Sequence, residues 1–165
     1  MTSTDTALLD ALLDSWDRNN AILVNLLNLV PDSGLDVRPT EGSPTLAALF
    51  THIHYVRLVF VSEDAPEFGV KIPGNEWEGD HDRARIAQLL NESAKTVRDV
   101  VKSRIDSGRA MDVHYDHPIL FLQHMIWHDG YHHGQIKLAL KAAGLPIPNK
   151  EAGPGTWRVW MNKSK

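Results

Sequence analysis

Residues 118–143 read PILFLQHMIWHDGYHHGQIKLALKAA, and the spacing of their side chains indicates the class of fold. Pro118 suits the first position of a helix, and Gly144 stands just after the last periodic residue, where helices commonly stop. One face of this helix, at steps of three and four residues, is formed by Phe121, Met125, His128, His132, Gln135 and Ala139. Apolar residues at this spacing are typical of a helix that buries one side against other helices. The stretch therefore predicts an all-α protein.

The rest of the chain predicts three more helices, at about residues 6–30, 44–62 and 83–107, before the fourth at 118–143. The first ends before Pro31, and the second begins with Ser43 as its N-cap and Pro44 behind it. The inward residues of the second helix are predicted to be Leu46, Leu49, Ile53, Val56 and Phe60. Residues 145–165 are rich in proline and glycine and are predicted to be an irregular tail, so that residues 1–165 form a single domain.

Residues 63–82 contain several prolines and glycines and no sustained periodicity, so they are predicted to be a long crossover between the second and third helices. The second helix spans about 28 Å at about 1.5 Å per residue, and a crossover of about 20 extended residues reaches farther than that. The chain can therefore return to its starting end before the third helix begins. This predicts an up-down-down-up four-helix bundle.

The composition excludes several classes of protein. The chain has 165 residues, with 17 lysines and arginines against 21 aspartates and glutamates, and its net charge of −4 disfavours nucleic-acid binding. It contains no cysteine, which excludes disulfides, thiolate metal ligands and cysteine nucleophiles. No apolar run approaches the length of a membrane span, and the N-terminus does not resemble a secretory signal. A cytoplasmic protein with no membrane partner is expected.

The chain has nine histidines, and two of them occupy inward positions of the fourth predicted helix. His128 and His132 are four residues apart, so both imidazoles lie on one face, about a turn apart, as a shared metal ion requires. The alternative for either residue is a hydrogen-bonded core histidine. His52 on the second helix is the predicted third ligand, whereas His54 should face elsewhere. With Asn20 on the first helix, these residues should lie at one height of the bundle.

Other polar residues are candidates for the surroundings of this site. Asn20 and Gln135 can either fix the register of the helices or support a metal ligand. Tyr131 can contribute a phenol to a pocket or be a half-buried structural residue, and His124 can line the cavity or lie on a half-exposed flank.

The remaining histidines are predicted to be surface residues. His133 should point away from the site, with Asp129 as its partner on the surface. The other three are expected to be solvated: His81, His114 and His117. In the tail, Trp157 and Trp160 either close over the mouth of the bundle or simply pack there.

The string His128-Asp-Gly-Tyr-His132-His-Gly-Gln-Ile resembles the fourth-helix signature of the DinB/YfiT-like family. The segment Ser43-Pro-Thr-Leu-Ala-Ala-Leu-Phe-Thr-His52 is similar to the second-helix segment of that family, which ends in a metal-binding histidine. The resemblance covers essentially the whole chain. It implies an up-down-down-up four-helix bundle, commonly a homodimer, with His52, His128 and His132 as metal ligands. His133 stands where the family usually has arginine.

The resemblance and the histidines together predict a metal-dependent enzyme with one divalent ion, zinc or nickel in the first place and iron as a further option. The ion would activate water or a small thiol, for hydrolysis or for thiol transfer to a small-molecule substrate. No residue is assigned a catalytic role, because the chain has no cysteine and no Gly-x-Ser-x-Gly motif. The alternative is a non-catalytic, stress-related dimeric bundle that binds a metal or another ligand. Structural zinc sites normally have four protein ligands, and only three are predicted here.

Overall fold

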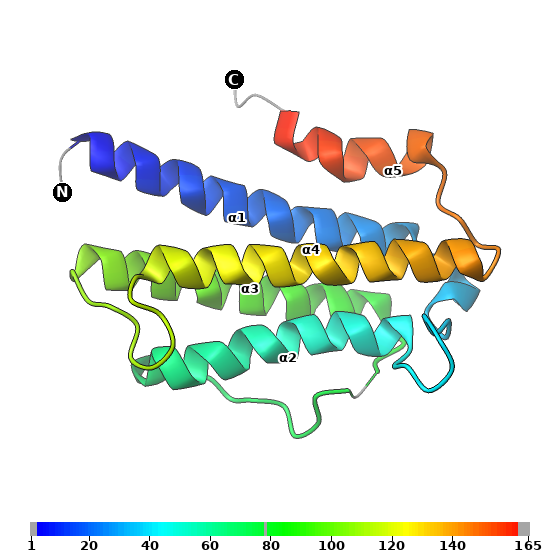
Figure 1. Ribbon diagram of the computed structural model, residues 1–165, viewed down its shortest axis with the longest axis horizontal. Coiled ribbons are helices and arrows are strands. Elements are labelled where there is room, and N and C mark those ends of the chain that lie inside the picture. The colour runs from blue at the N-terminus through cyan, green and yellow to red at the C-terminus, as the bar shows by residue number, and fades with distance from the viewer. Residues whose placement is uncertain (1–2, 78, 162–165) are drawn as a thin grey trace.

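The computed structural model describes residues 3–77 and 79–161. Within these ranges the chain forms five α-helices and no strand, so the predicted all-α class is confirmed. The α-helices are α1 (Ser3–Leu29), α2 (Leu46–Asp64), α3 (Arg83–Asp106), α4 (Pro118–Ala142) and α5 (Asn149–Gly155). Three short 3-10 helices accompany them: η1 (Asp32–Gly34), η2 (Pro66–Phe68) and η3 (Trp157–Met161). The four long helices lie side by side, and α5 lies along α1 (Figure 1).

The start of α2 differs from the prediction by two residues. Thr45, and not Ser43, is the N-cap, and its hydroxyl accepts a hydrogen bond from the amide of Ala48 at 3.2 Å. The hydroxyl of Ser43 instead lies 2.6 Å from the hydroxyl of Thr40 in the preceding loop. Thr45 has the extended backbone (φ −70°, ψ 164°) that an N-cap adopts, and α2 therefore begins after it.

The tail is not irregular as predicted, because α5 and η3 occupy most of its described part. Two side chains of α1 form hydrogen bonds with the backbone of this tail. The amide of Asn25 donates to the carbonyl oxygen of Gly155 at 2.9 Å, and the guanidinium of Arg18 donates to that of Val159 at 2.6 Å. Such long-range bonds to main-chain carbonyls cannot be read from the proline and glycine content of the tail.

The apolar core consists of two clusters. The Leu27 cluster includes Leu23, Leu26, Leu27, Leu46, Phe50, Ile53, Ile86, Leu90, Ile136 and Leu140. The Trp16 cluster includes Leu9, Leu13, Trp16, Val61, Ala94, Val97, Val101, Phe121 and Met125. Each of the four long helices contributes to both clusters, so each passes from one to the other along its length.

Between the two clusters, the long helices carry buried polar residues, which we call the polar layer. Its members are Asn19, Asn20, Arg57, Ser93, Asp129 and His132, each at most 8% exposed. Buried polar groups need hydrogen-bond partners, because burial without one costs free energy. The polar layer is therefore the part of the interior where side-chain chemistry, and not apolar packing, determines the arrangement.

None of the helices in the described part of the chain is long and apolar enough to cross a membrane.

Candidate metal centre

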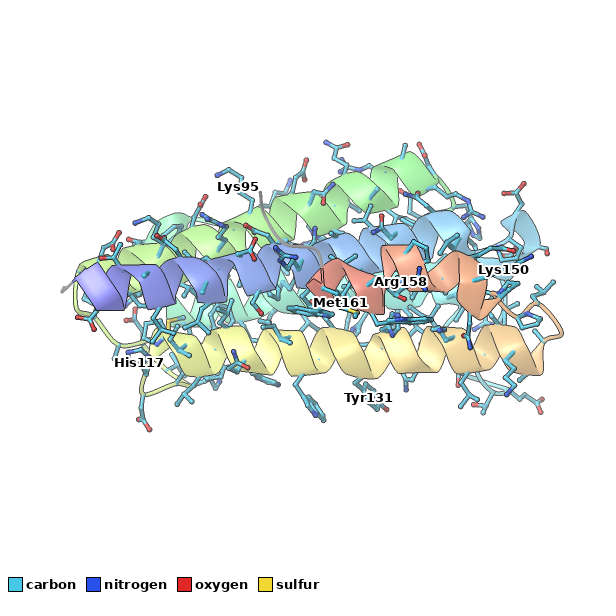
Figure 2. The ribbon with its side chains drawn as sticks, turned by 90° about the horizontal axis from the view of Figure 1, so that it is seen from above. Lys95, His117, Tyr131, Lys150, Arg158 and Met161 are labelled. Carbon is cyan, nitrogen blue, oxygen red and sulfur yellow. The ribbon has the colours of Figure 1, made fainter. Side chains whose placement is uncertain are left out.

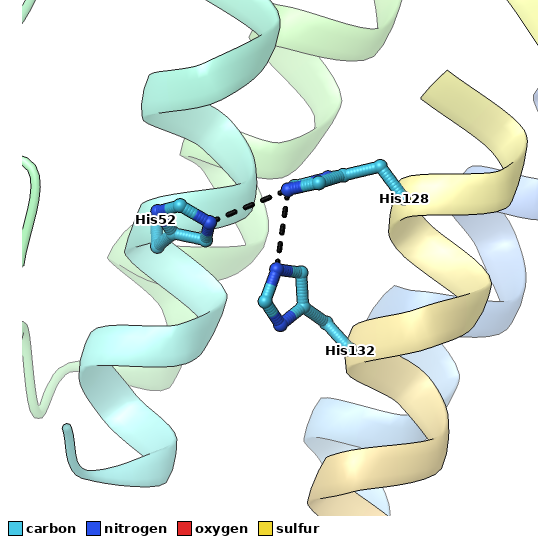
Figure 3. Close-up of side chains that lie close together, drawn as sticks. All are labelled: His52, His128 and His132. Atoms are coloured by element: carbon cyan, nitrogen blue, oxygen red, sulfur yellow. Dashed lines mark hydrogen bonds between the residues drawn. The ribbon is translucent and has the colours of Figure 1, made fainter. Parts of the chain in front are cut away.

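Three histidines from two helices converge at the polar layer, of which His132 is itself a member. His52 on α2 and His128 and His132 on α4 each offer a ring nitrogen, and these nitrogens all lie within 4.8 Å of one another. The Nε2 atom of His128 lies 3.3 Å from Nε2 of His52 and 3.1 Å from Nε2 of His132 (Figure 3). The three histidines selected from the sequence thus point their Nε2 atoms at a common point.

The surroundings keep two of these rings neutral. Burial, followed by repulsion from the imidazoles of His132 and His128, lowers the pKa of His52 to about 3. Burial, followed by repulsion from His128, lowers the pKa of His132 to about 4. Both rings are therefore uncharged at neutral pH, which is the state that binds a metal ion.

A hydrogen-bonded pair on α4 orients the ring of His132. Its Nδ1 donates to the side-chain oxygen of Gln135 at 2.8 Å, and the amide nitrogen of Gln135 donates to the hydroxyl of Tyr131 at 2.8 Å. With the hydrogen on Nδ1, the Nε2 of His132 has a free lone pair that faces the other two histidines. Gln135 and Tyr131 therefore lie next to the cluster, as two of the four predicted surrounding residues.

The crossover contributes two residues that sequence reasoning missed. One carboxylate oxygen of Glu76 lies 3.0 Å from Nδ1 of His52. The indole of Trp77 stacks on the ring of His52, with centroids 4.1 Å apart and planes 5° apart. The Nδ1 of His52 forms no hydrogen bond within the described part of the chain, so the carboxylate of Glu76 is close to the ring without being bonded to it. The sequence offers no periodic pattern in this segment from which either contact could have been found.

These residues fit a divalent ion. The Nε2 of His128 lies between two other nitrogens, and a neutral ring can donate a hydrogen to only one of them. If all three Nε2 atoms carry lone pairs, a single cation satisfies them together. Three neutral imidazole nitrogens are ligands that zinc, nickel and iron accept, whereas magnesium prefers oxygen.

The prediction for Asp129 was wrong. Its side chain is 1% exposed and is not a surface partner of His133. One of its oxygens, Oδ2, accepts hydrogen bonds from Arg57 at 2.6 Å and from Asn19 at 2.7 Å. Arg57 itself is fully buried, at 0% exposed, and was not considered as a site residue. The signal for it was present, because Arg57 lies four residues after the inward Ile53 on α2.

Two other predicted neighbours bond elsewhere. Asn20 accepts a hydrogen bond from Arg57 at 3.0 Å and donates to Asn91 at 2.7 Å, so it belongs to the polar layer and is linked to α2 and α3. His124 is half-buried, and its Nδ1 lies 2.7 Å from the hydroxyl of Tyr115. Neither residue forms its hydrogen bonds with the three histidines.

The remaining histidines lie away from the cluster. His54 faces α3, where its Nδ1 is 2.8 Å from the carbonyl oxygen of Leu89. His133 is half-buried on the tail side of α4, where it lines a cavity of about 220 Å³ with Trp157 and Trp160. The other three are exposed, as predicted, and are His81, His114 and His117. Of these, His114 also contacts α2: its Nδ1 lies 2.8 Å from Oδ2 of the buried Asp64, and its ring meets that of Phe60 edge-on.

Comparisons with known proteins concern the fold and the family of the chain. The chain is similar to a DinB-like protein from Bacillus cereus ATCC 10987, with a TM-score of 0.65 and 22% sequence identity over 84% of this chain and 95% of that one. At this identity the likeness concerns the fold. None of the curated proteins matches the chain. The sequence model of the DinB superfamily matches residues 15–136, which is most of the chain, and the protein therefore belongs to the DinB superfamily.

Proposed function

We propose that this protein is a metal-dependent enzyme whose single divalent ion is held by His52, His128 and His132. The observation that carries the proposal is the convergence of three Nε2 atoms from two helices, with all three ligand atoms within 4.8 Å of one another. Burial of two unsatisfied imidazoles is costly, so their grouping is best explained by a shared ligand. Zinc and nickel suit three nitrogen donors best, with iron as a further option.

The proposed reaction follows from the three histidine ligands and from the absence of cysteine in the chain. When bound, a divalent ion with only three protein ligands supplies Lewis acidity toward water or a small thiol. The chain has no cysteine to act as a nucleophile, so we propose hydrolysis or thiol transfer on a small-molecule substrate, including a low-molecular-weight thiol as the attacking partner. Gln135 holds the ring of His132 through a hydrogen bond on the side that faces away from the cluster, and the carboxylate of Glu76 lies 3.0 Å from the corresponding nitrogen of His52 without hydrogen-bond geometry.

We further propose the up-down-down-up bundle topology. On α1 and α4 the chain passes from the Trp16 cluster to the Leu27 cluster, and on α2 and α3 it passes in the opposite order. This ordering supports two helices of each direction, with the crossover returning the chain between α2 and α3.

A homodimer is part of the proposal, with the outward face of α4 as the interface between copies. Four large side chains on this face are between 52% and 68% exposed: Leu120, Trp127, Tyr131 and Leu138. Tyr131 points away from the other helices (Figure 2). A stripe on a single helix can meet the same stripe of a second copy, as a twofold interface requires.

The experiment that tests the proposed function starts with protein purified without metal-affinity resin. Bound metal is measured by elemental analysis in the wild type and in His52→Ala, His128→Ala and His132→Ala. We expect each substitution to remove most of the metal while the circular dichroism spectrum keeps its helical form. His54→Ala is the matched control, because it removes a buried imidazole of α2 that bonds Leu89 and should retain the metal.

The same variants distinguish the enzyme from the non-catalytic alternative. Ester-hydrolysis and thiol-transfer assays should show an activity in the metal-loaded wild type that is lost in all three variants. Collapse of the helical spectrum together with metal loss would instead indicate a structural ion. Unchanged metal content in all three variants would refute the site itself.

A further inference from the structure

Arg57 connects all four long helices through one buried guanidinium. From α2, its Nη2 donates to Oδ2 of Asp129 on α4 at 2.6 Å. Its Nη1 donates to Asn20 on α1 at 3.0 Å and to the carbonyl oxygen of Leu90 on α3 at 3.0 Å. The guanidinium also lies over the ring of Trp16, 4.8 Å from its centroid, within the range of a cation–π contact.

The two partners of this ion pair sit beside the three histidines in the sequence. Arg57 follows His52 by five residues on α2, and Asp129 directly follows His128 on α4. The pair therefore joins the same two helices, at nearly the same height, that have to bring their Nε2 atoms together. A shift of α2 along α4 would break the Arg57–Asp129 contact and separate His52 from His128 at once.

The second carboxylate oxygen of Asp129 lies close to the cluster without a hydrogen bond to it. Its Oδ1 has no hydrogen-bond partner in the described part of the chain and lies 3.8 Å from Nδ1 of His128, which is also buried and unpartnered. A carboxylate on this side of the ring favours the tautomer that carries the hydrogen on Nδ1. That tautomer leaves the lone pair of His128 on Nε2, where His52 and His132 converge.

The buried ion pair between Arg57 and Asp129 is not expected to stabilise the fold. Moving two charges out of water costs about as much as their attraction returns, and apolar replacements of equal size are often neutral or stabilising. A buried ion pair is therefore better explained by the geometry that it enforces. We propose that Arg57 and Asp129 are positioning residues, which set the register of α2 against α4 and the orientation of His128 for metal binding. The inference rests on the proposed metal site.

The test replaces both charges together, because either single substitution leaves an unpaired charge in the core and can prevent folding. The variant Arg57→Met/Asp129→Leu keeps the side chains close in size and removes the ion pair. Affinity for Zn²⁺ and for Ni²⁺ is measured by competition with a coloured chelator, and the melting temperature is measured on the metal-free protein. We expect a metal-free melting temperature at or above that of the wild type, and metal binding weakened by about tenfold to a hundredfold.

A matched control is available in the same chain. Arg104 on α3 is also buried, at 1% exposed, and pairs with Asp112 at 2.7 Å and Glu67 at 2.9 Å, outside the polar layer. Its two carboxylate partners are 35% and 40% exposed, so Arg104→Met leaves no charge buried without a partner, and the variant should fold and keep its metal affinity.

Three results would overturn the positioning role of Arg57 and Asp129, and they differ in whether they also refute the proposed metal site. Equal affinity in the double variant and the wild type would refute the positioning role while the metal site stands. An equal loss of affinity in Arg104→Met would mean that any loss of a buried arginine loosens the site. A wild type that binds neither Zn²⁺ nor Ni²⁺ would refute the proposed function and the positioning role together.

Discussion

The hydrogen on Nδ1 of His132 determines what its other nitrogen can do. Gln135 accepts that hydrogen at 2.8 Å, and its own amide is held by the hydroxyl of Tyr131 at 2.8 Å. One exposed phenol thus fixes an amide, and the amide fixes a buried imidazole. Partners of this kind, one step away from a metal ion, affect affinity even though they never touch it.

Replacing Gln135 with leucine should therefore weaken metal binding by about tenfold, because the ring of His132 loses its orienting acceptor. The measurement is chelator competition with Zn²⁺. Gln123→Leu, at an exposed position of the same helix, is the control and should bind as tightly as the wild type. Equal affinity in both variants would show that Gln135 does not orient the ring.

Stability of the metal-free protein should depend on pH through His52 and His132. Their pKa values fall from 6.5 in the unfolded chain to about 3 and about 4 in the folded protein. Between these values the unfolded chain binds protons that the folded protein does not, so the free energy of unfolding falls as the pH is lowered. The stabilisation is complete above pH 6.5 and is lost progressively as the pH falls, down to about pH 4 for His132 and about pH 3 for His52.

Urea titrations at about pH 7 and about pH 5 in the presence of a chelator measure this loss. Carboxylates also titrate toward the acid end, so the comparison is with His52→Asn/His132→Asn. The double variant should lose clearly less stability over the interval than the wild type. Parallel losses in the two proteins would contradict the assignment to these residues.

At the scale of the helices, the hydrophobic pattern of α2 predicts only part of its buried face. Its predicted inward positions Leu46, Leu49 and Ile53 are buried, but Val56 and Phe60 are only half-buried. The inward face continues instead through Arg57 and Val61. A hydrophobic pattern does not predict that a charged residue such as Arg57 is buried, because burial of an unpaired charge is prohibitive. The pattern also contains no information about Asp129, the carboxylate that pairs with Arg57.

The N-terminus of α3 is held by Asp82, whose carboxylate accepts from the amides of Ala84 at 2.9 Å and Arg85 at 3.3 Å. Asp82→Ala should lower the free energy of unfolding by about 1 kcal/mol, because two amides of the first turn lose their acceptor. Urea unfolding measures the change. Asp82→Asn retains a capping oxygen and should cost only a few tenths of a kcal/mol, or about the experimental error. A loss in Asp82→Asn equal to that in Asp82→Ala would argue against capping.

At the scale of the whole molecule, the polar layer divides the interior into two apolar halves. The features that could be predicted are those that follow from the helical spacing of residues in the sequence. They are the four long helices and the position of two of the three clustered histidines on one face of α4. His52 was found because it flanks the inward face of α2. The contacts of Glu76 and Trp77 with His52 could not be predicted, because an aperiodic crossover can rest on the bundle in many ways and only its three-dimensional path selects one.

The outward stripe on α4 leads to a prediction about assembly. Trp127 is 67% exposed, and its ring stacks on Tyr131 with centroids 5.9 Å apart. If a second copy covers this stripe, Trp127→Glu places a charge in the interface and should convert a dimer into a monomer. Light scattering coupled to size-exclusion chromatography measures the mass.

Leu8→Glu is the control for this prediction. Leu8 is 62% exposed on α1, and its substitution should leave the dimer intact. A wild type that elutes as a monomer, or dissociation in both variants, would refute the α4 interface.

The position of Trp16 under the guanidinium of Arg57 gives the protein an optical reporter. Of the five tryptophans, Trp16 is 0% exposed, and the other four are between 41% and 67% exposed. Iodide ions in solution quench the fluorescence of accessible indoles and spare an enclosed one. In the Trp127→Glu variant, which removes the indole that a second copy would cover, emission that survives quenching therefore comes from the centre of the bundle. Its wavelength and lifetime follow the electric field of the neighbouring cation without any attached dye.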